Sequence, residues 1–492
     1  MQQTPDDQQQ DGRSPGKYQG KGSSRFFAHS TQVFRHHVPT EFILLGVIES
    51  VLLIGSFYTG IAIRLGIDDF HERIGRFFPN SLLFAAVILL CLIAFGAYQR
   101  QPNKSTNILA VRIGASVLAG MIILSMIYYI APVFTMYRGS LLLSIFVSYV
   151  ALMAGRLLFL RIAKTHDIRL RILVLGSGKT AELVREVQAR GEINDINIIA
   201  YMPMPGDNGD TKGIGITQTV GSLTKFVMDN SIDVIVLAMD DRRSGLPIHE
   251  LLDVKMGGVE VIDLLTFFER NTSKIRLDIM NPSWMFLSDG FQMNNFRRTW
   301  KRIFDIVAVL LLLPVVLPIA LLISIAIMLE SGFKGAIFYT QTRVGQDGLP
   351  FRIYKFRSMV VDAERDGVAR WAASNDARIT HVGALLRKFR LDEVPQLFNI
   401  LKGDMSFVGP RPERPEFVSQ LAKKIPYYNE RHRVKPGLSG WAQIRYPYGA
   451  SEEDGLEKLQ YDLYYVKNYS ILLDVLVLLQ TVEVVLLGRG AQ

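Results

Sequence analysis

The hydropathy of the chain changes from segment to segment, beginning with a polar stretch over residues 1–40. This stretch is rich in Gln, Ser and Gly and lacks the charged-then-apolar layout of a cleaved signal peptide, so we expect a disordered cytoplasmic tail. Four apolar runs follow, each close to the ~20 residues that a membrane-spanning helix needs. They predict a four-helix transmembrane bundle over residues 41–165, with helices near 42–63, 77–99, 113–137 and 139–160.

Lysines and arginines gather before the first apolar run, between the second and third, and after the fourth. By the positive-inside rule, both ends of the bundle are cytoplasmic. Glu49 and Arg156 lie inside apolar runs, where a charge is costly unless it pairs, reaches water or faces the bundle interior. We expect a structural pair or a snorkelling arginine, and a functional pathway is the alternative.

Between residues 166 and 285 the pattern changes to short buried strands that alternate with helical segments. The first strand runs into a turn with Gly176 and Gly178 that opens a helix, and further strands are predicted at 197–201, 234–237 and 259–262. This is the layout of a Rossmann-like α/β domain. The two glycines are candidates for holding a cofactor phosphate, but no acidic residue ends the second strand to bind a ribose. A scaffold without a cofactor is the equal alternative.

A fifth apolar run follows Lys301, Arg302 and Asp305 and is uncharged from residue 306 to 329. As a straight helix it would be about 36 Å long, enough to cross a bilayer. Crossing would place everything after Glu330, with its many lysines and arginines, on the opposite face from the middle domain. Because prolines break helices, we expect a re-entrant membrane helix over 297–329 that turns back near Pro318. Residues 330–492 then form a mostly α-helical catalytic domain on the cytoplasmic side.

Composition agrees with a membrane protein that carries soluble domains. The 492 residues are 49% hydrophobic and carry a net charge of +9. This charge suits anionic lipid and phosphorylated substrates, whereas nucleic acid is not expected as a partner, because no reader module occurs. Cys91 is the only cysteine, so the chain has neither a disulfide framework nor a cysteine metal site.

The most informative chemistry lies at Asp392 and Glu393, two adjacent carboxylates in front of a helical apolar pattern. A loop that contains Pro410, Arg411 and Pro412 follows. Carboxylates can act as a nucleophile and a magnesium ligand, and an arginine fork can hold phosphate oxygens. The pattern therefore favours phosphoryl transfer. The structural alternative is that Asp392 caps the next helix and Glu393 complements its dipole.

Several motifs in order, from about residue 300 to 487, resemble the bacterial sugar transferases. These are polyprenyl-phosphate hexose-1-phosphate transferases, and the chain is most similar to the large, exopolysaccharide-associated type, such as undecaprenyl-phosphate glucose phosphotransferases. The middle domain resembles the accessory NAD- or CoA-binding-like module of the large members. The motifs are the segments 338–345, 354–359, 386–393, 409–412, 431–443 and 461–468.

The resemblance implies transfer of hexose 1-phosphate, with glucose or galactose as the expected sugar, from a UDP-sugar to undecaprenyl phosphate. UMP is released, and this is the first membrane step of exopolysaccharide, capsule or O-antigen synthesis. Asp392 would be the nucleophile that forms an aspartyl-phosphosugar intermediate, Glu393 the Mg²⁺ ligand, and Arg387 a residue that orients the carboxylates or a phosphate. Further substrate-binding candidates are Lys355, Arg357, Pro410, Arg411, Pro412, Arg431, Arg433 and Asp462. A solvated or lipid-facing basic surface is the alternative for Lys355, Arg357, Arg431 and Arg433.

The family's re-entrant helix matches at Lys301, Arg302, Asp305 and Pro318, whereas Leu317 stands where the family has a serine. Because nucleotide sugars are made in the cytoplasm, the resemblance implies a multi-pass protein of the bacterial inner membrane with a cytoplasmic catalytic domain. The apolar run 471–487 contains Asp474 and Glu483, so we expect it to lie in the interface or pack on the domain. A homodimer and downstream glycosyltransferases are compatible partners.

Two other functions are alternatives to phosphosugar transfer. Membrane-anchored nucleotide-sugar dehydratases or epimerases also combine four helices with a Rossmann domain, but their chemistry needs a Tyr-x-x-x-Lys pair, and that spacing does not occur in the chain. A non-enzymatic membrane sensor would not depend on Asp392. Phosphosugar transfer is therefore the preferred hypothesis.

Overall fold

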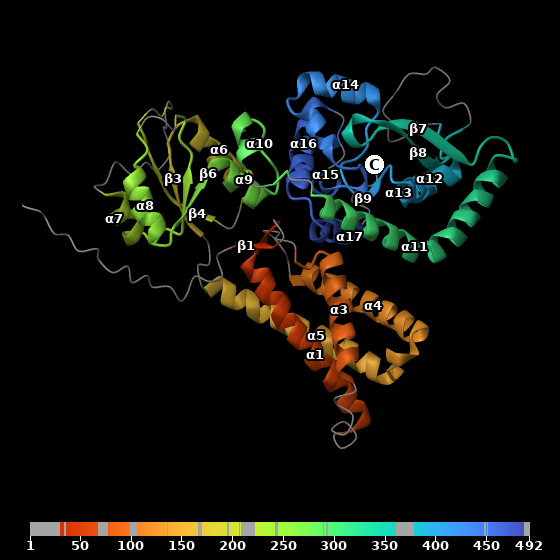
Figure 1. Ribbon diagram of the computed structural model, residues 1–492. Coiled ribbons are helices and arrows are strands. Elements are labelled where there is room, and N and C mark those ends of the chain that lie inside the picture. The colour runs from red at the N-terminus through yellow and green to blue at the C-terminus, as the bar shows by residue number, and fades with distance from the viewer. Residues whose placement is uncertain are drawn as a thin grey trace, which may run out of the picture. The chain divides into compact units, whose positions relative to one another are not determined.

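The computed structural model describes residues 30–33, 36–66, 77–98, 106–134, 136–165, 170–193, 196–205, 207, 222–241, 245–288, 290–291, 294–360, 378–446, 449 and 451–486. These residues are mostly helical and form two compact units (Figure 1). The described part of the smaller unit falls within Ile168–Gly191 and Asp195–Leu264. The larger unit comprises Ser30–Asp167, Glu192–Asn194 and Leu265–Gln492.

The predicted tail is only partly described. Strands β1 (Ser30–Val33) and β2 (His36–Pro39) pair antiparallel, with Ser30 opposite Pro39. The expectation of disorder up to residue 40 is therefore wrong for this short hairpin, in which backbone hydrogen bonds replace those to water. Residues 1–29 lie outside the described residues.

The membrane bundle contains the four predicted helices: α1 (Thr40–Leu65), α3 (Phe78–Ala94), α4 (Thr106–Ile130) and α5 (Arg138–Thr165). A short 3-10 turn, η3 (Pro132–Phe134), precedes α5. Phe57, Phe84 and Ile113 pack in the core of the four-helix bundle. Four helices of the described chain are long and apolar enough to cross a membrane, namely α1, α4, α5 and the later helix α11 (Asn295–Glu330), whereas α3 has 17 residues. At about 25 Å, α3 reaches the lower limit for a span.

Glu49 and Arg156 form the structural pair that was expected, with 2.5 Å between Arg156 Nε and Glu49 Oε1. The hydroxyl of Tyr98 donates to the same carboxylate. Arg156 and Arg112 also donate to the carbonyls of Ala97 and Gly96, at 2.6 and 2.5 Å, just after α3. The two arginines thus satisfy buried carbonyls of the segment that follows the helix.

The smaller unit has a four-stranded parallel sheet in the order β4-β3-β5-β6. Its strands are β3 (Leu170–Leu175), β4 (Ile196–Met202), β5 (Val234–Leu237) and β6 (Glu260–Asp263), and its helices are α6 (Lys179–Ala189), α7 (Leu223–Asp229) and α8 (Ile248–Met256). The predicted strands are confirmed to within one residue at most ends.

The predicted end of the middle domain at residue 285 is too late. Helices α9 (Leu264–Thr272) and α10 (Pro282–Leu287) belong to the larger unit beyond Leu264. Leu265 and Met280 pack into the core of the C-terminal region, and buried Glu269 lies 2.5 Å from Lys467 Nζ. The sequence pattern shows that a helix has an apolar face, but it does not show which domain that face packs against.

The C-terminal region packs around an apolar core that includes Trp441, Tyr464 and Tyr465. After α11 come the hairpin β7 (Phe338–Val344) and β8 (Pro350–Phe356), joined by η4 (Gln346–Gly348), then α12 (His381–Lys388), η5 (Leu391–Glu393) and α13 (Gln396–Lys402). The later elements are β9 (Ser406–Val408), α14 (Pro415–Lys424), η6 (Tyr428–Arg433), β10 (Gly437–Ser439), α15 (Trp441–Arg445), α16 (Glu452–Lys467) and α17 (Ile471–Leu486).

Helix α11 is continuous by its hydrogen bonds although it contains Pro314 and Pro318, and Figure 1 shows that it changes direction part-way. Its two ends contact nearby elements of the C-terminal region. Arg302 donates to the carbonyls of Ile400 and Leu401, and the Glu330 carboxylate accepts from the backbone N–H of Val382 at 3.2 Å. A straight helix of this length would separate its ends by about 54 Å.

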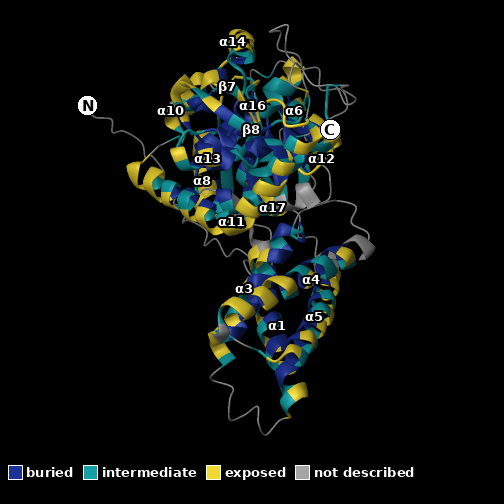
Figure 2. Ribbon diagram, turned by 90° about the vertical axis from the view of Figure 1, so that its right-hand side faces the viewer, coloured by how far each residue is buried: buried dark blue, intermediate teal, exposed yellow. Residues whose placement is uncertain are grey.

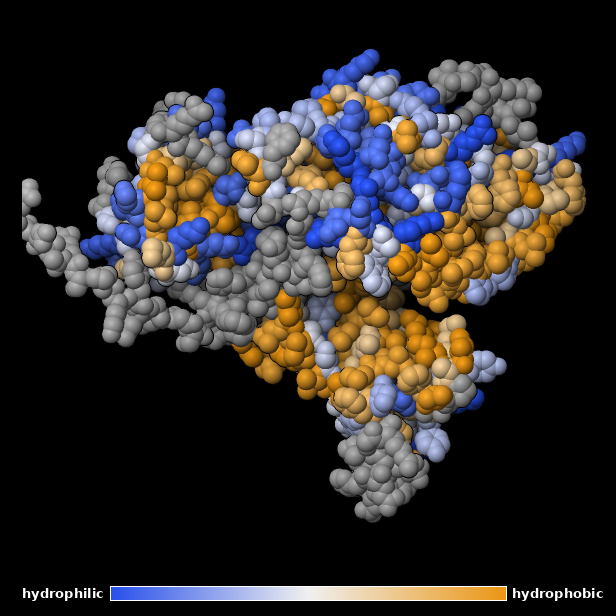
Figure 3. Space-filling model, viewed as in Figure 1, coloured by the Kyte–Doolittle hydropathy of each residue, from blue (hydrophilic) through white to orange (hydrophobic). Residues whose placement is uncertain are grey.

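The polar residues at the start of α11 bind protein groups. Lys301 Nζ lies 2.5 Å from Asp474 Oδ2, and Asp305 accepts from Ser406 Oγ and Phe407 N at 3.0 and 3.1 Å. Because Asp474 is fully buried, α17 packs on the domain, one of the two alternatives expected for it. Exposed apolar side chains run along the rest of α11 and form an apolar surface (Figures 2 and 3).

Candidate active site

Asp392 and Glu393 lie in the 3-10 turn η5, between α12 and α13. The residue before this turn, Arg390, has a φ of 52°, a left-handed backbone that costs energy for a residue with a side chain. Helix α13 starts after Pro395 and has no side-chain cap. The alternative that Asp392 caps this helix is therefore wrong, and the turn instead points two carboxylates into one site.

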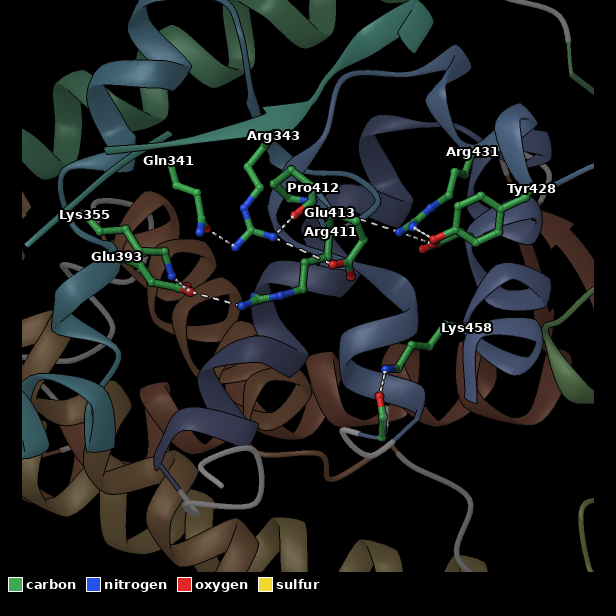
Figure 4. A network of polar contacts seen from close by, with 12 residues as sticks. Gln341, Arg343, Lys355, Glu393, Arg411, Pro412, Glu413, Tyr428, Arg431 and Lys458 are labelled. Carbon is green, nitrogen blue, oxygen red and sulfur yellow. Dashed lines mark hydrogen bonds and ion pairs between the residues drawn. The ribbon is translucent and has the colours of Figure 1, made fainter. Parts of the chain in front are cut away.

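Lys355 and Arg411 bring positive charge to these carboxylates (Figure 4). Lys355 Nζ lies 3.0 Å from Glu393 Oε1 and 3.7 Å from Asp392 Oδ2. Arg411 Nη2 lies 3.6 Å from the same oxygen of Glu393. Lys355 comes from β8 and Arg411 from the loop after β9, so three distant segments assemble the site.

The two carboxylates differ in their electrostatics. Burial raises the pKa of Asp392, although Lys355 opposes the increase. Burial alone would also raise the pKa of Glu393, but Lys355 and Arg411 outweigh it and lower the pKa to about 2. Glu393 is therefore firmly ionised, whereas Asp392 is the more basic of the pair, and a more basic carboxylate is the better nucleophile once ionised.

Arg387 is expected to orient the carboxylates or a phosphate, and that role stays a prediction. Its Nε donates to Ser358 Oγ at 3.1 Å, and its charge lowers the pKa of Asp392 against the effect of burial.

Two other substrate-binding candidates, Arg357 and Arg433, make their contacts away from the carboxylates. Arg357 donates to the carbonyl of Lys334, and Arg433 pairs with Glu430 with 66% of its side chain exposed. For these two the alternative of a basic surface fits the structure better.

The loop Gly409–Pro412 is held by close contact between two backbones. Gly409 N donates to Ser439 O at 2.9 Å, and Gly437 N donates to Pro410 O at 3.0 Å, beside the parallel pairing of β9 with β10. A Cβ atom at Gly409 would lie 2.3 Å from the carbonyl oxygen of Lys435. Gly409 is therefore required for the approach of the two segments.

Arg431 and Asp462, expected to bind substrate, are buried together with 2.8 Å between Arg431 Nη2 and Asp462 Oδ2. Arg431 also donates to the carbonyl of Arg411 at 3.0 Å. Burial raises the pKa of Asp462 to about 6, although Arg431 opposes it. Arg431 and Asp462 thus support the backbone of the Arg411 loop, and their expected contact with substrate stays a prediction.

Arg343 was missed as a site residue, although its motif 338–345 was recognised. Its Nη1 donates to the carbonyl of Pro412 at 3.1 Å and lies 3.8 Å from Glu413 Oε2, while its Nη2 donates to Gln341 Oε1 at 2.6 Å. Burial and the charge of Arg411 lower the pKa of Arg343. Gln341 and Arg343 are two residues apart on a strand and therefore lie on the same face of β7. This spacing is the sequence signal that could have identified Arg343.

The pair of carboxylates fits Mg²⁺ only together with substrate oxygens. Among the described residues, no group of three or more His, Cys, Asp or Glu side chains lies together as a metal site. Mg²⁺ is commonly held by one or two carboxylates and by substrate phosphates. An ionised Glu393, with Asp392 beside it, meets that requirement.

The glycine turn of the smaller unit is bonded to carboxylates of the chain itself. Asp240 accepts from the backbone N–H groups of Lys179 and Thr180 at 3.2 and 2.9 Å, and Asp207 accepts from that of Ser177 at 2.9 Å. A Cβ atom at Gly178 would lie 2.1 Å from Asp240 Oδ2. The N–H groups that a cofactor phosphate would use thus have anionic partners already, which favours the scaffold alternative for Gly176 and Gly178.

The chain is similar in sequence to a family model and to several known proteins. The model of the bacterial sugar transferase family matches residues 296–488. A UDP-glucose:undecaprenyl-phosphate glucose-1-phosphate transferase of Xanthomonas campestris pv. campestris is 30% identical over 68% of this chain and 70% of its own length.

Other relatives match over a smaller part of their length. A UDP-N-acetylgalactosamine-undecaprenyl-phosphate N-acetylgalactosaminephosphotransferase of Aeromonas hydrophila is 47% identical over 39% of this chain and 45% of its own length. A UDP-glucose:undecaprenyl-phosphate glucose-1-phosphate transferase of Escherichia coli (strain K12) is 37% identical over 56% of this chain, and the match spans 60% of that relative. The family model matches the region that contains Asp392 and Glu393, and the chain belongs to the bacterial sugar transferase family.

Proposed function

We propose that the chain transfers a sugar 1-phosphate from a UDP-sugar to undecaprenyl phosphate and releases UMP. The observation that carries this proposal is the pair Asp392–Glu393, with its two carboxylates in different electrostatic states beside Lys355 and Arg411. The similar proteins are named for undecaprenyl-phosphate acceptors but for different sugars, glucose and N-acetylgalactosamine. The sugar is therefore left to experiment.

The first step is a displacement at the phosphorus that carries the sugar. An Asp392 oxygen forms a bond to this phosphorus while the bond to the bridging oxygen breaks, and UMP leaves with that oxygen and its electron pair. Both the nucleophile and the leaving group are anions, so no proton has to move. Arg411 and Lys355 offset the negative charge of the diphosphate.

The second step returns Asp392 to its starting state. A phosphate oxygen of undecaprenyl phosphate attacks the phosphorus of the acyl phosphate, and the bond to the Asp392 oxygen breaks. The product is undecaprenyl diphosphate sugar. In the first step, Mg²⁺ held by Glu393 together with diphosphate oxygens would further neutralise the charge of the leaving UMP.

We also propose that α11 is re-entrant and that the catalytic domain faces the cytoplasm at the inner membrane. The contacts of Arg302 with the end of α13 and of Glu330 with the start of α12 support this topology, because both ends of the helix then stay with one domain. The exposed apolar side chains between them suit lipid. In a Cys91→Ser background, Ser331→Cys should react with an impermeant maleimide only from the cytoplasmic face; labelling only from the periplasm would rule the topology out.

The activity is tested with the full chain in detergent or nanodiscs. UDP-glucose, UDP-galactose and UDP-N-acetylgalactosamine are each incubated with undecaprenyl phosphate and Mg²⁺, and UMP is measured. At least one donor should release UMP, and EDTA should stop the release. Failure of all UDP-sugars with a folded protein would contradict the proposal, as would full activity of Asp392→Asn.

A further inference from the structure

Two arginines from different elements donate to successive carbonyls of the loop that carries Arg411. Arg431 of η6 donates to the carbonyl of Arg411 at 3.0 Å. Arg343 of β7 donates to the carbonyl of the next residue, Pro412, at 3.1 Å. Figure 4 shows the two guanidinium groups on either side of the loop.

Each arginine is in turn fixed by its own partners. Arg343 is held by Gln341 and lies near Glu413, while Arg431 is held by Asp462 and by the hydroxyl of Tyr428, at 2.7 Å. Figure 4 shows the contacts of Arg343 with Gln341 and of Arg431 with Tyr428. A planar guanidinium that is anchored in this way gives both distance and direction to the hydrogen bond it donates.

The loop has little freedom left. Pro410 and Pro412 restrict the backbone on both sides of Arg411, and Val344 N donates to Glu413 O at 3.0 Å. The side chain of Arg411 remains 32% exposed and reaches toward Glu393. The Arg411 guanidinium therefore approaches Glu393 from a backbone that is held at two successive carbonyls.

We propose that Arg343 and Arg431 are positioning residues that hold the backbone of Arg411, so that its guanidinium is preset to bind the diphosphate of the UDP-sugar. The proposal rests on the proposed function and deepens it, because it assigns donor affinity to two residues that do not contact the donor. Preorganisation of this kind lowers the entropy that is lost on binding. A misplaced anchor of about 1 Å can cost up to roughly 100-fold in kcat/KM.

A double-mutant cycle in the full chain tests the inference. Arg343→Met should raise KM for the UDP-sugar about tenfold, leave KM for undecaprenyl phosphate unchanged, and change kcat little. In an Arg411→Ala background the same substitution should have almost no further effect, because its target is gone. Losses that multiply in the double variant would overturn the proposal, since Arg343 would then act independently of Arg411.

Further variants separate positioning from folding. Arg431→Met leaves Asp462 buried without its partner, so it is paired with Asp462→Asn, and Gln341→Ala loosens Arg343 without burying a charge. Both variants should raise KM for the UDP-sugar. An unchanged KM in a folded variant would contradict the positioning role of Arg343 and Arg431. Arg433→Met, an exposed arginine next to the same segment, is the matched control and should keep wild-type kinetics. If the wild-type chain releases no UMP, the proposed function fails and not this inference.

Discussion

The ammonium group of Lys355 is hydrogen-bonded to the carboxylate of Glu393, at 3.0 Å. The same ammonium lies farther, 3.7 Å, from Asp392. This asymmetry separates two neighbouring acids into a firmly ionised group suited to metal or phosphate binding and a more basic group suited to attack phosphorus.

The first prediction concerns the two acids. Asp392→Asn should abolish UMP release, by at least about 1,000-fold, because the amide cannot form the acyl phosphate. Glu393→Gln should lower the rate comparably but should still allow slow accumulation of radiolabelled sugar phosphate on the protein. Retention of label on Asp392→Asn would show that another residue is the nucleophile.

The second prediction concerns pH. Lys355 lowers the pKa of both carboxylates, so Lys355→Met should raise both. A carboxylate must be ionised to react, and activity is lost as pH falls through its pKa; the acid limb of the pH–rate profile should therefore move to higher pH in Lys355→Met. UMP release measured across about pH 4 to 8 checks this. The matched control is Arg357→Met, whose guanidinium contacts Lys334, and its acid limb should stay in place.

The third prediction concerns the anchor of α11. Lys301→Met removes the partner of Asp474, which is fully buried, and should destabilise the protein by about 3–5 kcal/mol. Asp474→Asn in the same background should recover much of this loss, because no uncompensated charge is then buried. Thermal unfolding in detergent measures both variants. Equal melting temperatures for Lys301→Met and the double variant would contradict the expected coupling.

The fourth prediction concerns the glycine turn of the smaller unit. Because Asp240 and Asp207 already accept from its N–H groups, NAD and coenzyme A should not raise the melting temperature of the chain. Asp240→Ala removes one of these anionic partners and is the variant most expected to gain weak phosphate binding. Clear stabilisation of the unmodified chain by either nucleotide would show that the turn opens for a ligand.

Several elements could be predicted because the information is local. The runs of apolar residues gave the bundle helices, and the buried strand at 234–237 coincides with β5. The adjacent acids Asp392 and Glu393 were recognised as a pair without any contact being known. The boundary at residue 285 was wrong because the apolar faces of α9 and α10 fit either neighbour, and only packing decides between them.

The roles of the basic residues could not be separated in the same way. In the sequence, nothing distinguishes the roles of Lys355, Arg357, Arg431 and Arg433. In the fold, Lys355 contacts the carboxylates and Arg431 is buried against Asp462. Arg357 and Arg433 make contacts at the surface. The free energy of a charged side chain depends on its partner and its burial, and both come from segments far apart in the chain.

The sequence by itself determined that this is a membrane protein with a parallel α/β unit, and it predicted an acid pair suited to phosphoryl transfer, because hydrophobic period and residue chemistry are local properties. Only the tertiary structure decided that Arg411 lies near Glu393 and that Arg343 and Arg431 donate to carbonyls of its loop. It also decided that the glycine turn is bonded to the chain's own carboxylates. These outcomes depend on distances between segments that meet only in the fold, where burial and opposing charges set the energy of each contact.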